Sequence, residues 1–174
     1  RRPMTSESKR QAVVAEIPRL RRYAIALMRD RSAADDLVQD CVIRALDRLH
    51  LWRDGTNMRT WLFTIMHNLH ANEMRRRSRM RDNRQIDPEL PERGEAANQE
   101  HVVELRQLAG ALARLPEAQR EILLLVGLEG LTYAETAEVL GVPVGTVMSR
   151  VSRAREGLRR LLGGENEPQL RRVK

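Results

Sequence analysis

Apolar residues recur with the period of an α-helix along most of this chain. The first such series runs from Val13 to Met28 and is interrupted by Pro18, which we expect to open a helix rather than to lie inside one. The second series follows Ser32, a residue suited to capping a helix, and Val38 and Leu46 broaden its apolar stripe. The stripe itself comprises Leu37, Cys41, Ala45 and Leu49. Both series predict amphipathic helices with one buried face.

A third helix is predicted from Met58 to Arg77, because turn-forming residues precede it and an apolar face runs along it. The preceding break is Arg53-Asp54-Gly55-Thr56-Asn57. The apolar face comprises Trp61, Leu62, Ile65 and Leu69. The far end of the helix reads RRRSRMRDNR, six arginines in ten residues. Positive charge near a helix C-terminus offsets the helix dipole, but six arginines exceed what this effect needs and favour contact with phosphates.

Residues 132–160 have the pattern of two helices joined by a tight turn. The first of them opens with a capping-box sequence, TYAE, at residues 132–135. Gly141 suits the left-handed residue that ends this helix, and Pro143 suits the first turn of the next one. Three positions have the spacing and size of a helix-turn-helix contact: Ala137, Gly141 and Val147. The segment is therefore predicted to be a helix-turn-helix.

The second of these helices carries a buried stripe and an opposite polar face. The stripe comprises Val147, Val151, Ala154 and Leu158. The opposite face comprises Thr146, Ser149, Arg150 and Arg153, spaced i, i+3, i+4 and i+7. A narrow, polar and cationic face is typical of a helix that enters the major groove of DNA. An exposed basic face on an ordinary helical hairpin is the alternative.

Composition indicates an all-α protein with a polyanionic partner. Aromatic residues make up only 3% of the chain and β-branched runs are short, which favours helices over sheets. The formal net charge is +7, and Lys9 and Lys174 are the only lysines among the 31 basic residues. Arginine favours bidentate contacts with phosphates and bases, although a GC-rich genome produces the same bias.

The 174 residues are enough for two small domains, and a polar segment separates them. Residues 86–100, IDPELPERGEAANQE, contain two prolines, one glycine, five acidic residues and one arginine, which predicts a flexible acidic linker. We therefore expect two small helical domains, at residues 10–85 and 101–162, with tails at residues 1–9 and 163–174.

The sequence carries no signature of catalysis, of a cofactor or of membrane insertion. It contains no glycine-rich phosphate loop, nucleophile elbow or convincing acid pair, so we expect neither a catalytic residue nor a cofactor. His67 and His70 could share a metal, but no third ligand stands at a recognisable spacing, and we expect no metal site. Cys41 is the only cysteine, and the longest apolar run, residues 122–126, is far too short to span a membrane. With no signal-peptide core in its first residues, the chain is expected to be cytoplasmic.

The predicted helix after Ser32 also bears an acidic face on an otherwise basic domain. This face comprises Asp36, Gln39, Asp40 and Asp47. It is either a solvated face that balances nearby arginines or a docking site for a basic partner protein.

Four segments follow one another along the chain: a DDLVQD helix, a WLFTIMHN helix ending in arginines, an acidic linker and a GTVMSRVSRAR helix-turn-helix. In this order they resemble the extracytoplasmic-function sigma factors, the smallest class of bacterial RNA polymerase sigma factor. The resemblance covers about residues 10–162, nearly the whole chain. It implies a first helical domain called region two, a second domain called region four, and no third domain between them.

The resemblance also assigns roles to residues of this chain. The helix that docks on the clamp helices of the polymerase largest subunit corresponds to Asp35, Asp36, Gln39 and Asp40. The loop and helix that capture a flipped base of the minus-ten promoter element correspond to Thr56, Asn57, Met58 and Asn68. The residues that hold phosphates near the melted strand correspond to Arg75, Arg76 and Arg77. The reader of the minus-thirty-five element corresponds to Thr146, Ser149, Arg150 and Arg153. Met148 departs from the family, which often has lysine or arginine there.

The function that the resemblance implies is to bring core polymerase to promoters and to assist promoter melting, without catalysis by this chain. The implied partners are the RNA polymerase core, promoter DNA and an anti-sigma factor, and the linker is expected to thread toward the polymerase active-site channel. Two other classes stay open. A stand-alone helix-turn-helix regulator would bind duplex DNA without polymerase and would leave WLFTIMHN and DDLVQD unexplained. A metal-dependent nuclease would use His67 and His70.

Overall fold

The computed structural model describes residues 4–81 and 101–163, so the predicted linker at residues 86–100 and residues 164–174 of the predicted tail lie outside it. Every regular element in these two ranges is helical, which confirms the predicted all-α class. The first half contains α1 (Ser6–Met28), α2 (Arg31–Asp47), a short 3₁₀ turn η1 (Leu49–Leu51) and α3 (Met58–Arg81). The second half contains α4 (His101–Arg114), α5 (Glu117–Leu123), a π-helical segment η2 (Leu124–Leu128), α6 (Tyr133–Leu140) and α7 (Val144–Leu162).

α1 begins earlier than predicted and contains the proline that was expected to open it. The side chain of Thr5 caps the helix by accepting a hydrogen bond from a backbone N–H three residues later. Residues 6–9, predicted to belong to a tail, are therefore the first turn of α1. Pro18 lies inside the helix, so the prediction that it opens a helix was wrong. Burial of Val13 before it and Leu20 after it keeps both parts of α1 in the core and offsets the lost backbone hydrogen bond.

α2 is capped by Asp30, and the prediction that Ser32 caps it was wrong. Oδ1 of Asp30 accepts a hydrogen bond from the N–H of Ala33 at 3.0 Å. Arg29 adopts a left-handed φ of 62° and ends α1, so only Arg29 and Asp30 separate the two helices. The reversal of the chain at Arg29 thus fixes where α2 begins.

The apolar faces of the first three helices form one core. Tyr23 and Phe63 meet edge to face, with 5.0 Å between their ring centroids. The predicted stripe of α2 is buried, but Leu46, which was predicted to broaden it, is exposed. Cys41 is buried, its Sγ donates to the carbonyl of Leu62, and burial raises the pKa of its thiol to about 12. This cysteine is therefore a packing residue, protonated at neutral pH.

The helix-turn-helix forms as the sequence predicts. Thr132 and Glu135 make both hydrogen bonds of the capping box, and Gly141 ends α6 with φ 63° and ψ 35°. α7 begins at Val144, so Pro143 lies immediately before the helix rather than in its first turn. The core of this unit comprises Ile122, Ala137, Val147, Val151 and Ala154.

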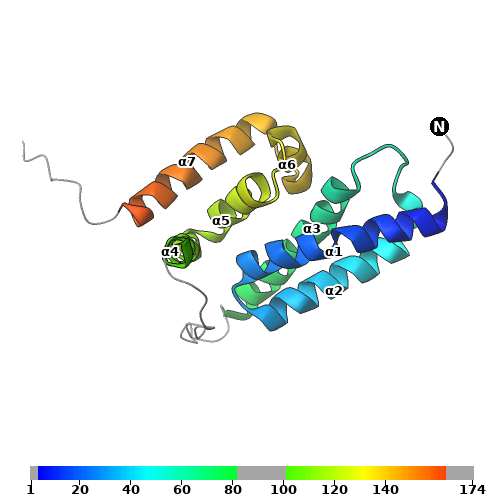
Figure 1. Cartoon of the computed structure of the whole chain (residues 1–174), viewed down its shortest axis with the longest axis horizontal. Coiled ribbons are helices and arrows are strands. Elements are labelled where there is room, and N and C mark those ends of the chain that lie inside the picture. The colour runs from blue at the N-terminus through cyan, green and yellow to red at the C-terminus, as the bar shows by residue number, and fades with distance from the viewer. Residues whose placement is uncertain (1–3, 82–100, 164–174) are drawn as a thin grey trace, which may run out of the picture.

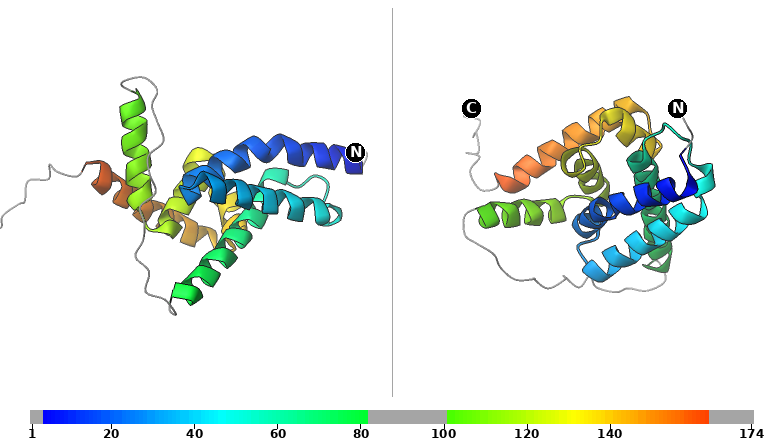
Figure 2. Two further views of the ribbon diagram at one scale, coloured as in Figure 1. Left: turned by 90° about the horizontal axis from the view of Figure 1, so that it is seen from below. Right: turned by 45° about the vertical axis from the view of Figure 1, so that its right-hand side comes forward.

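The two halves of the molecule share an apolar core. Figure 1 shows α5 and α6 between α7 and the first three helices, and the right-hand view of Figure 2 shows α6 above α3. Four residues of the second half belong to the same buried cluster as the first three helices: Leu124, Leu125, Leu131 and Val139. The two domains are therefore in direct apolar contact. None of the helices in the described ranges is long and apolar enough to cross a membrane.

Two glycines of the second half should respond oppositely to alanine. Gly141→Ala forces a side chain into a left-handed conformation and is expected to lower the free energy of unfolding by about 1–2 kcal/mol. Gly110 lies within α4, where a Cβ meets no atom within 4 Å, so Gly110→Ala should raise it by about 0.5–1 kcal/mol. Urea denaturation measures both changes. Equal stabilities of the two variants would contradict the assigned turn.

Candidate nucleic-acid interface

α7 presents most of the predicted DNA-reading residues to solvent. Ser149, Arg150 and Arg153 are exposed, whereas Thr146 is partly buried. Oγ of Ser149 donates to the carbonyl of Thr146 at 3.0 Å, which turns this hydroxyl toward its own helix. Neither Arg150 nor Arg153 makes an ion pair within residues 4–81 and 101–163, so both guanidinium groups can contact DNA.

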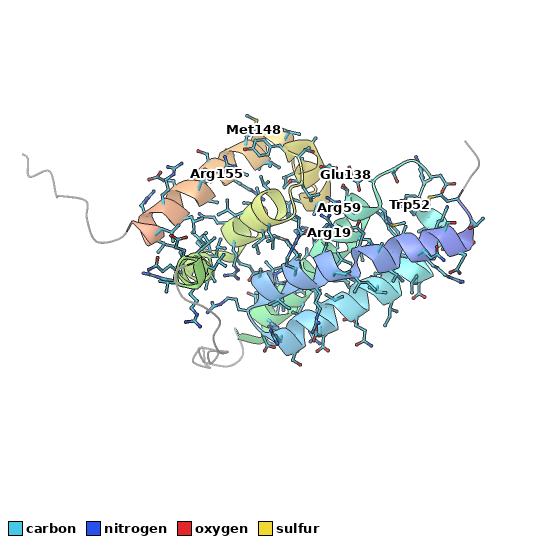
Figure 3. The ribbon with its side chains drawn as sticks, in the orientation of Figure 1. Arg19, Trp52, Arg59, Glu138, Met148 and Arg155 are labelled. Atoms are coloured by element: carbon cyan, nitrogen blue, oxygen red, sulfur yellow. The ribbon has the colours of Figure 1, made fainter. Side chains whose placement is uncertain are left out.

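Two exposed apolar residues of α7 were not included in the predicted reading face. Val144 and Met148 stand four residues apart near the beginning of the helix, and both are exposed. Figure 3 shows Met148 near the beginning of α7 and Arg155 further along the same helix. The sequence pattern alone favoured charged side chains as candidates, and only the orientation of α7 shows that this apolar pair faces solvent.

The loop before α3 is anchored on α1. Nζ of Lys9 lies 2.9 Å from Oδ1 of Asp54 and 5.3 Å from the centroid of the Trp52 ring. The backbone N–H of Met4 donates to the other carboxylate oxygen of Asp54 at 3.0 Å. The hydrogen bond from Lys9 is the main cause that lowers the pKa of Asp54. No pattern in the sequence indicates that Lys9 positions this loop.

Asn57 has two roles in the structure. Its Oδ1 accepts a hydrogen bond from the N–H of Arg59 at 3.0 Å, which caps α3. Its Nδ2 donates to Oε1 of Glu135 in α6 at 2.7 Å. A residue predicted to face the minus-ten element is therefore bonded to the helix-turn-helix domain.

The other predicted minus-ten residues differ in exposure. Oγ1 of Thr56 donates to the carbonyl of Arg53 at 2.8 Å, and Met58 packs partly buried against the core. Asn68 is exposed on α3, and its side chain makes no hydrogen bond to the described part of the chain. Asn68 is thus the residue of this group that is most available to a nucleic-acid base.

The arginines at the end of α3 make local contacts but stay exposed. Arg75 donates to Ala71 and Asn72, while Arg76 and Arg77 both pair with Glu73. These two ion pairs are the main cause that lowers the pKa of Glu73. Because such surface pairs are weak and easily exchanged, the arginines can transfer to phosphates.

On α2, one of the predicted docking residues forms an ion pair with α1, and the other three are exposed to solvent. Asp35 forms a bidentate ion pair with Arg21, at 2.8 and 3.2 Å, and this lowers the pKa of Asp35. Asp36, Gln39 and Asp40 are exposed. Asp36 and Asp40 line a groove between α2 and α3, opposite Arg76 and Arg77. Of the predicted docking residues, Asp35 is the one whose side chain has a partner within the described part of the chain.

The two histidines of α3 contact separate glutamates of the second half. Nδ1 of His67 lies 2.6 Å from Oε1 of Glu121, and Nε2 of His70 lies 2.7 Å from Oε1 of Glu117. Within the described ranges no three histidine, cysteine or acidic side chains gather as a metal site would need. Both histidines therefore act at the contact between the two halves.

An ion pair between α1 and the segment after η2 completes this contact. Nη2 of Arg22 lies 2.9 Å from Oε1 of Glu129, whose side chain is 0% exposed. Such a buried carboxylate is tolerated only when it is paired. Four pairs of side chains in the described ranges join the two halves, and we call them the interdomain bridge: Asn57–Glu135, His67–Glu121, His70–Glu117 and Arg22–Glu129.

Comparison with known proteins identifies both halves. A profile described as the sigma2 domain of PhyR matches residues 13–67, and one described as Sigma-70, region 4 matches residues 105–158. The chain is 38% identical to the ECF RNA polymerase sigma factor EcfG of Rhodopseudomonas palustris, over 92% of this chain and 87% of that protein.

Two solved structures are also similar. The sigma factor RpoE of Bartonella quintana, in complex with the anti-sigma factor NepR, has a TM-score of 0.74 and 33% identity over 90% of this chain and 97% of that one. CnrH, in complex with the cytosolic domain of CnrY, has a TM-score of 0.66 and 26% identity over 93% of this chain and 92% of that one. The chain belongs to the extracytoplasmic-function sigma factors of RNA polymerase, which direct the core enzyme to specific promoters. This confirms the family that its motifs resemble.

The bridge predicts how stability depends on pH. The hydrogen bond with His70 is the main cause that lowers the pKa of Glu117 below its ordinary 4.5. The ionised carboxylate is favoured by folding, so its contribution is complete above the ordinary pKa and is lost as the pH falls through the lowered value. Glu117→Gln should cost about 1 kcal/mol at pH 7, a small value because the side chain is 34% exposed, and less near pH 3.

Denaturant unfolding at both pH values measures this difference. Glu138→Gln, at an exposed position of α6, is the control and should leave stability unchanged at either pH. A cost for Glu117→Gln that is independent of pH would contradict the assigned contact.

Proposed function

We propose that this sigma factor works through three surfaces and that the described arrangement is its inactive, closed form. The surfaces are the acidic groove face of α2, the exposed end of α3 with its preceding loop, and the outer side of α7. The observation that carries this proposal is the bond between Asn57 and Glu135, because it joins a minus-ten reading residue to the minus-thirty-five reading domain. The chain acts in the cytoplasm and contributes no catalytic residue of its own.

The acidic face of α2 is proposed to dock on the polymerase core. Asp36, Gln39 and Asp40 are exposed, and their charge suits a basic partner surface. Asp35 joins the contact only by leaving Arg21. Once docked, two weak DNA contacts act from one complex, so their joint affinity exceeds that of either alone.

Promoter melting is proposed to use Asn68 and the loop at Thr56, Asn57 and Met58. A flipped base loses its stacking and must recover that free energy through hydrogen bonds in a pocket. Asn68 offers an exposed amide for this purpose, and Arg75, Arg76 and Arg77 can bind phosphates nearby. Upstream, Ser149, Arg150 and Arg153 are proposed to contact the minus-thirty-five element, with Thr146 at their edge.

The closed form is proposed to be the one that an anti-sigma factor holds. The Bartonella quintana structure, which contains an anti-sigma factor, resembles this chain across both halves. In this chain Asn57 is hydrogen-bonded to Glu135. His67, the residue before Asn68, is hydrogen-bonded to Glu121. Binding to the polymerase must separate the halves before the minus-ten strand can reach α3.

Docking is tested by reversing charge on α2. Asp36→Arg with Asp40→Arg should weaken binding to core polymerase by about tenfold or more and reduce run-off transcription equally, because like charges then face each other. Glu138→Arg, at an exposed position of α6 outside this face, is the control and should retain affinity. Unchanged core affinity of the double variant, with normal circular dichroism, would exclude this surface.

Base capture is tested at Asn68. Asn68→Ala should impair open-complex formation more than closed-complex binding, because the base is captured only after the strands separate. Permanganate footprinting measures melting and filter binding measures the closed complex. Asn72→Ala, one turn later on α3, is the control. Equal losses at both steps would mean that Asn68 has a structural role.

Closure is tested by weakening the interdomain bridge. Glu117→Gln with Glu121→Gln should increase the radius of gyration of the free chain in X-ray scattering. The same variant should bind a single-stranded minus-ten oligonucleotide from a transcribed promoter more tightly, because α3 is uncovered. Glu138→Gln with Glu156→Gln changes the same charge at exposed positions and is the control. Identical behaviour of the two double variants would refute the closed form.

A further inference from the structure

The loop that leads into α3, residues 53–57, lies beside the beginning of α1, as Figures 1 and 2 show. All five of its residues are exposed. A backbone hydrogen bond closes its turn, from the N–H of Thr56 to the carbonyl of Arg53 at 3.2 Å, and Gly55 supplies a left-handed φ of 87°. A single turn of this kind leaves an exposed loop free to move, so its conformation depends on the elements that hold it.

Lys9 on α1 holds the base of this loop through three contacts of one ammonium group. Nζ of Lys9 lies 2.9 Å from Oδ1 of Asp54, donates to the carbonyl of Trp52 at 3.4 Å, and lies 5.3 Å from the centroid of the Trp52 ring. Trp52 is itself buried, so it is a fixed point on the first domain. Because the Lys9 side chain is only 17% exposed, water and salt screen this contact less than they screen an ordinary surface ion pair.

The contact with Lys9 is independent of the second domain. Asn57, at the other end of the loop, is hydrogen-bonded to Glu135, and this bond would be lost when the halves separate as proposed above. The contacts of Asp54 with Lys9 and with the backbone N–H of Met4 both lie within the first domain, so separation of the halves does not break them. Lys9 can therefore hold the loop at the time when the loop meets DNA.

We propose that Lys9 is a positioning residue for promoter melting, because it keeps the loop in the conformation that captures the flipped base. A loop that is already ordered loses little conformational entropy when it binds, whereas a released loop must be ordered at the moment of capture. The apparent affinity falls with the fraction of molecules that hold the capturing conformation. In this role Lys9 acts through the loop rather than on the DNA. This inference rests on the proposed role of the loop at Thr56, Asn57 and Met58.

Abasic nucleotides test the inference, because they remove one base and leave the phosphate backbone in place. Holoenzyme is assembled from core polymerase and the full chain and bound to a transcribed promoter whose minus-ten region is already unpaired, with each minus-ten nucleotide made abasic in turn. The wild type should lose about tenfold in affinity at the captured base. Lys9→Met should bind the intact template about fivefold more weakly and the abasic template as the wild type does, so its loss at that base should be about twofold.

Matched variants separate positioning from folding and from direct contact with phosphate. Methionine keeps the aliphatic length of Lys9 over Trp52, and the melting temperature of the free chain checks the fold. Arg10→Met removes the same charge from the adjacent exposed position and should behave as the wild type. Asp54→Asn should reproduce the smaller loss at the captured base, and adding it to Lys9→Met should change nothing further, because both act through one contact. Equal weakening of intact and abasic templates by Lys9→Met, with or without a shallower salt dependence, would overturn the inference, since Lys9 would then bind phosphate or only support the fold.

A variant of the loop distinguishes failure of this inference from failure of the proposed function. Thr56→Ala with Asn57→Ser removes the side chains proposed to meet the base, while serine keeps the cap of α3. This double variant should lose the effect of the abasic nucleotide. If it does and Lys9→Met matches the wild type, the loop captures the base without Lys9 and only this inference is overturned. If neither variant changes the effect, or the wild type shows none, the loop does not capture a base, and the proposed melting role fails together with the inference.

Discussion

The side chains of Leu124 and Leu125, which belong to the second domain, are buried in the apolar cluster formed by α1, α2 and α3. They come from η2, where the helix widens to a π-turn and the N–H of Glu129 bonds to the carbonyl of Leu124. Exposing these leucines and their neighbours would return a large apolar area to water. The relative position of the two domains, and with it access to α3, therefore depends on η2 together with Leu131 and Val139, which lie in the same cluster.

The interdomain bridge fixes the relative orientation of the two domains, which the apolar contact alone would not. Hydrophobic burial tolerates many orientations, whereas a carboxylate facing an imidazole or a guanidinium is satisfied in only a few. Glu129 is buried and must meet Arg22, and Glu117 and Glu121 must meet His70 and His67. Polar pairs of this kind can exchange partners with water or phosphate at small cost once the leucines separate, so they suit a contact that has to open.

The helix proposed to read the upstream element, α7, contributes no residue to the interdomain bridge. α7 packs on α5 and α6, and its outer side remains exposed while Asn57 is occupied. Under the proposed function, the two promoter-reading surfaces are controlled differently. The upstream reader would be available in the closed form, whereas the melting surface would become accessible only when the domains separate. Reading before melting is the order that promoter binding requires, because base capture follows strand separation.

The sequence by itself determined the helices, the helix-turn-helix and the family. Local signals carry these features: the capping box at Thr132 and Glu135, the left-handed Gly141, and apolar stripes with a helical period. It misjudged Pro18 and Ser32, where burial and the position of the preceding helix outweighed local preference. Only the tertiary structure decided that His67 and His70 meet glutamates, that Lys9 anchors the loop and that Val144 and Met148 face solvent. Pairs such as Arg22 and Glu129 are 107 residues apart, and no periodic pattern encodes a contact that depends on how two separate helical units pack.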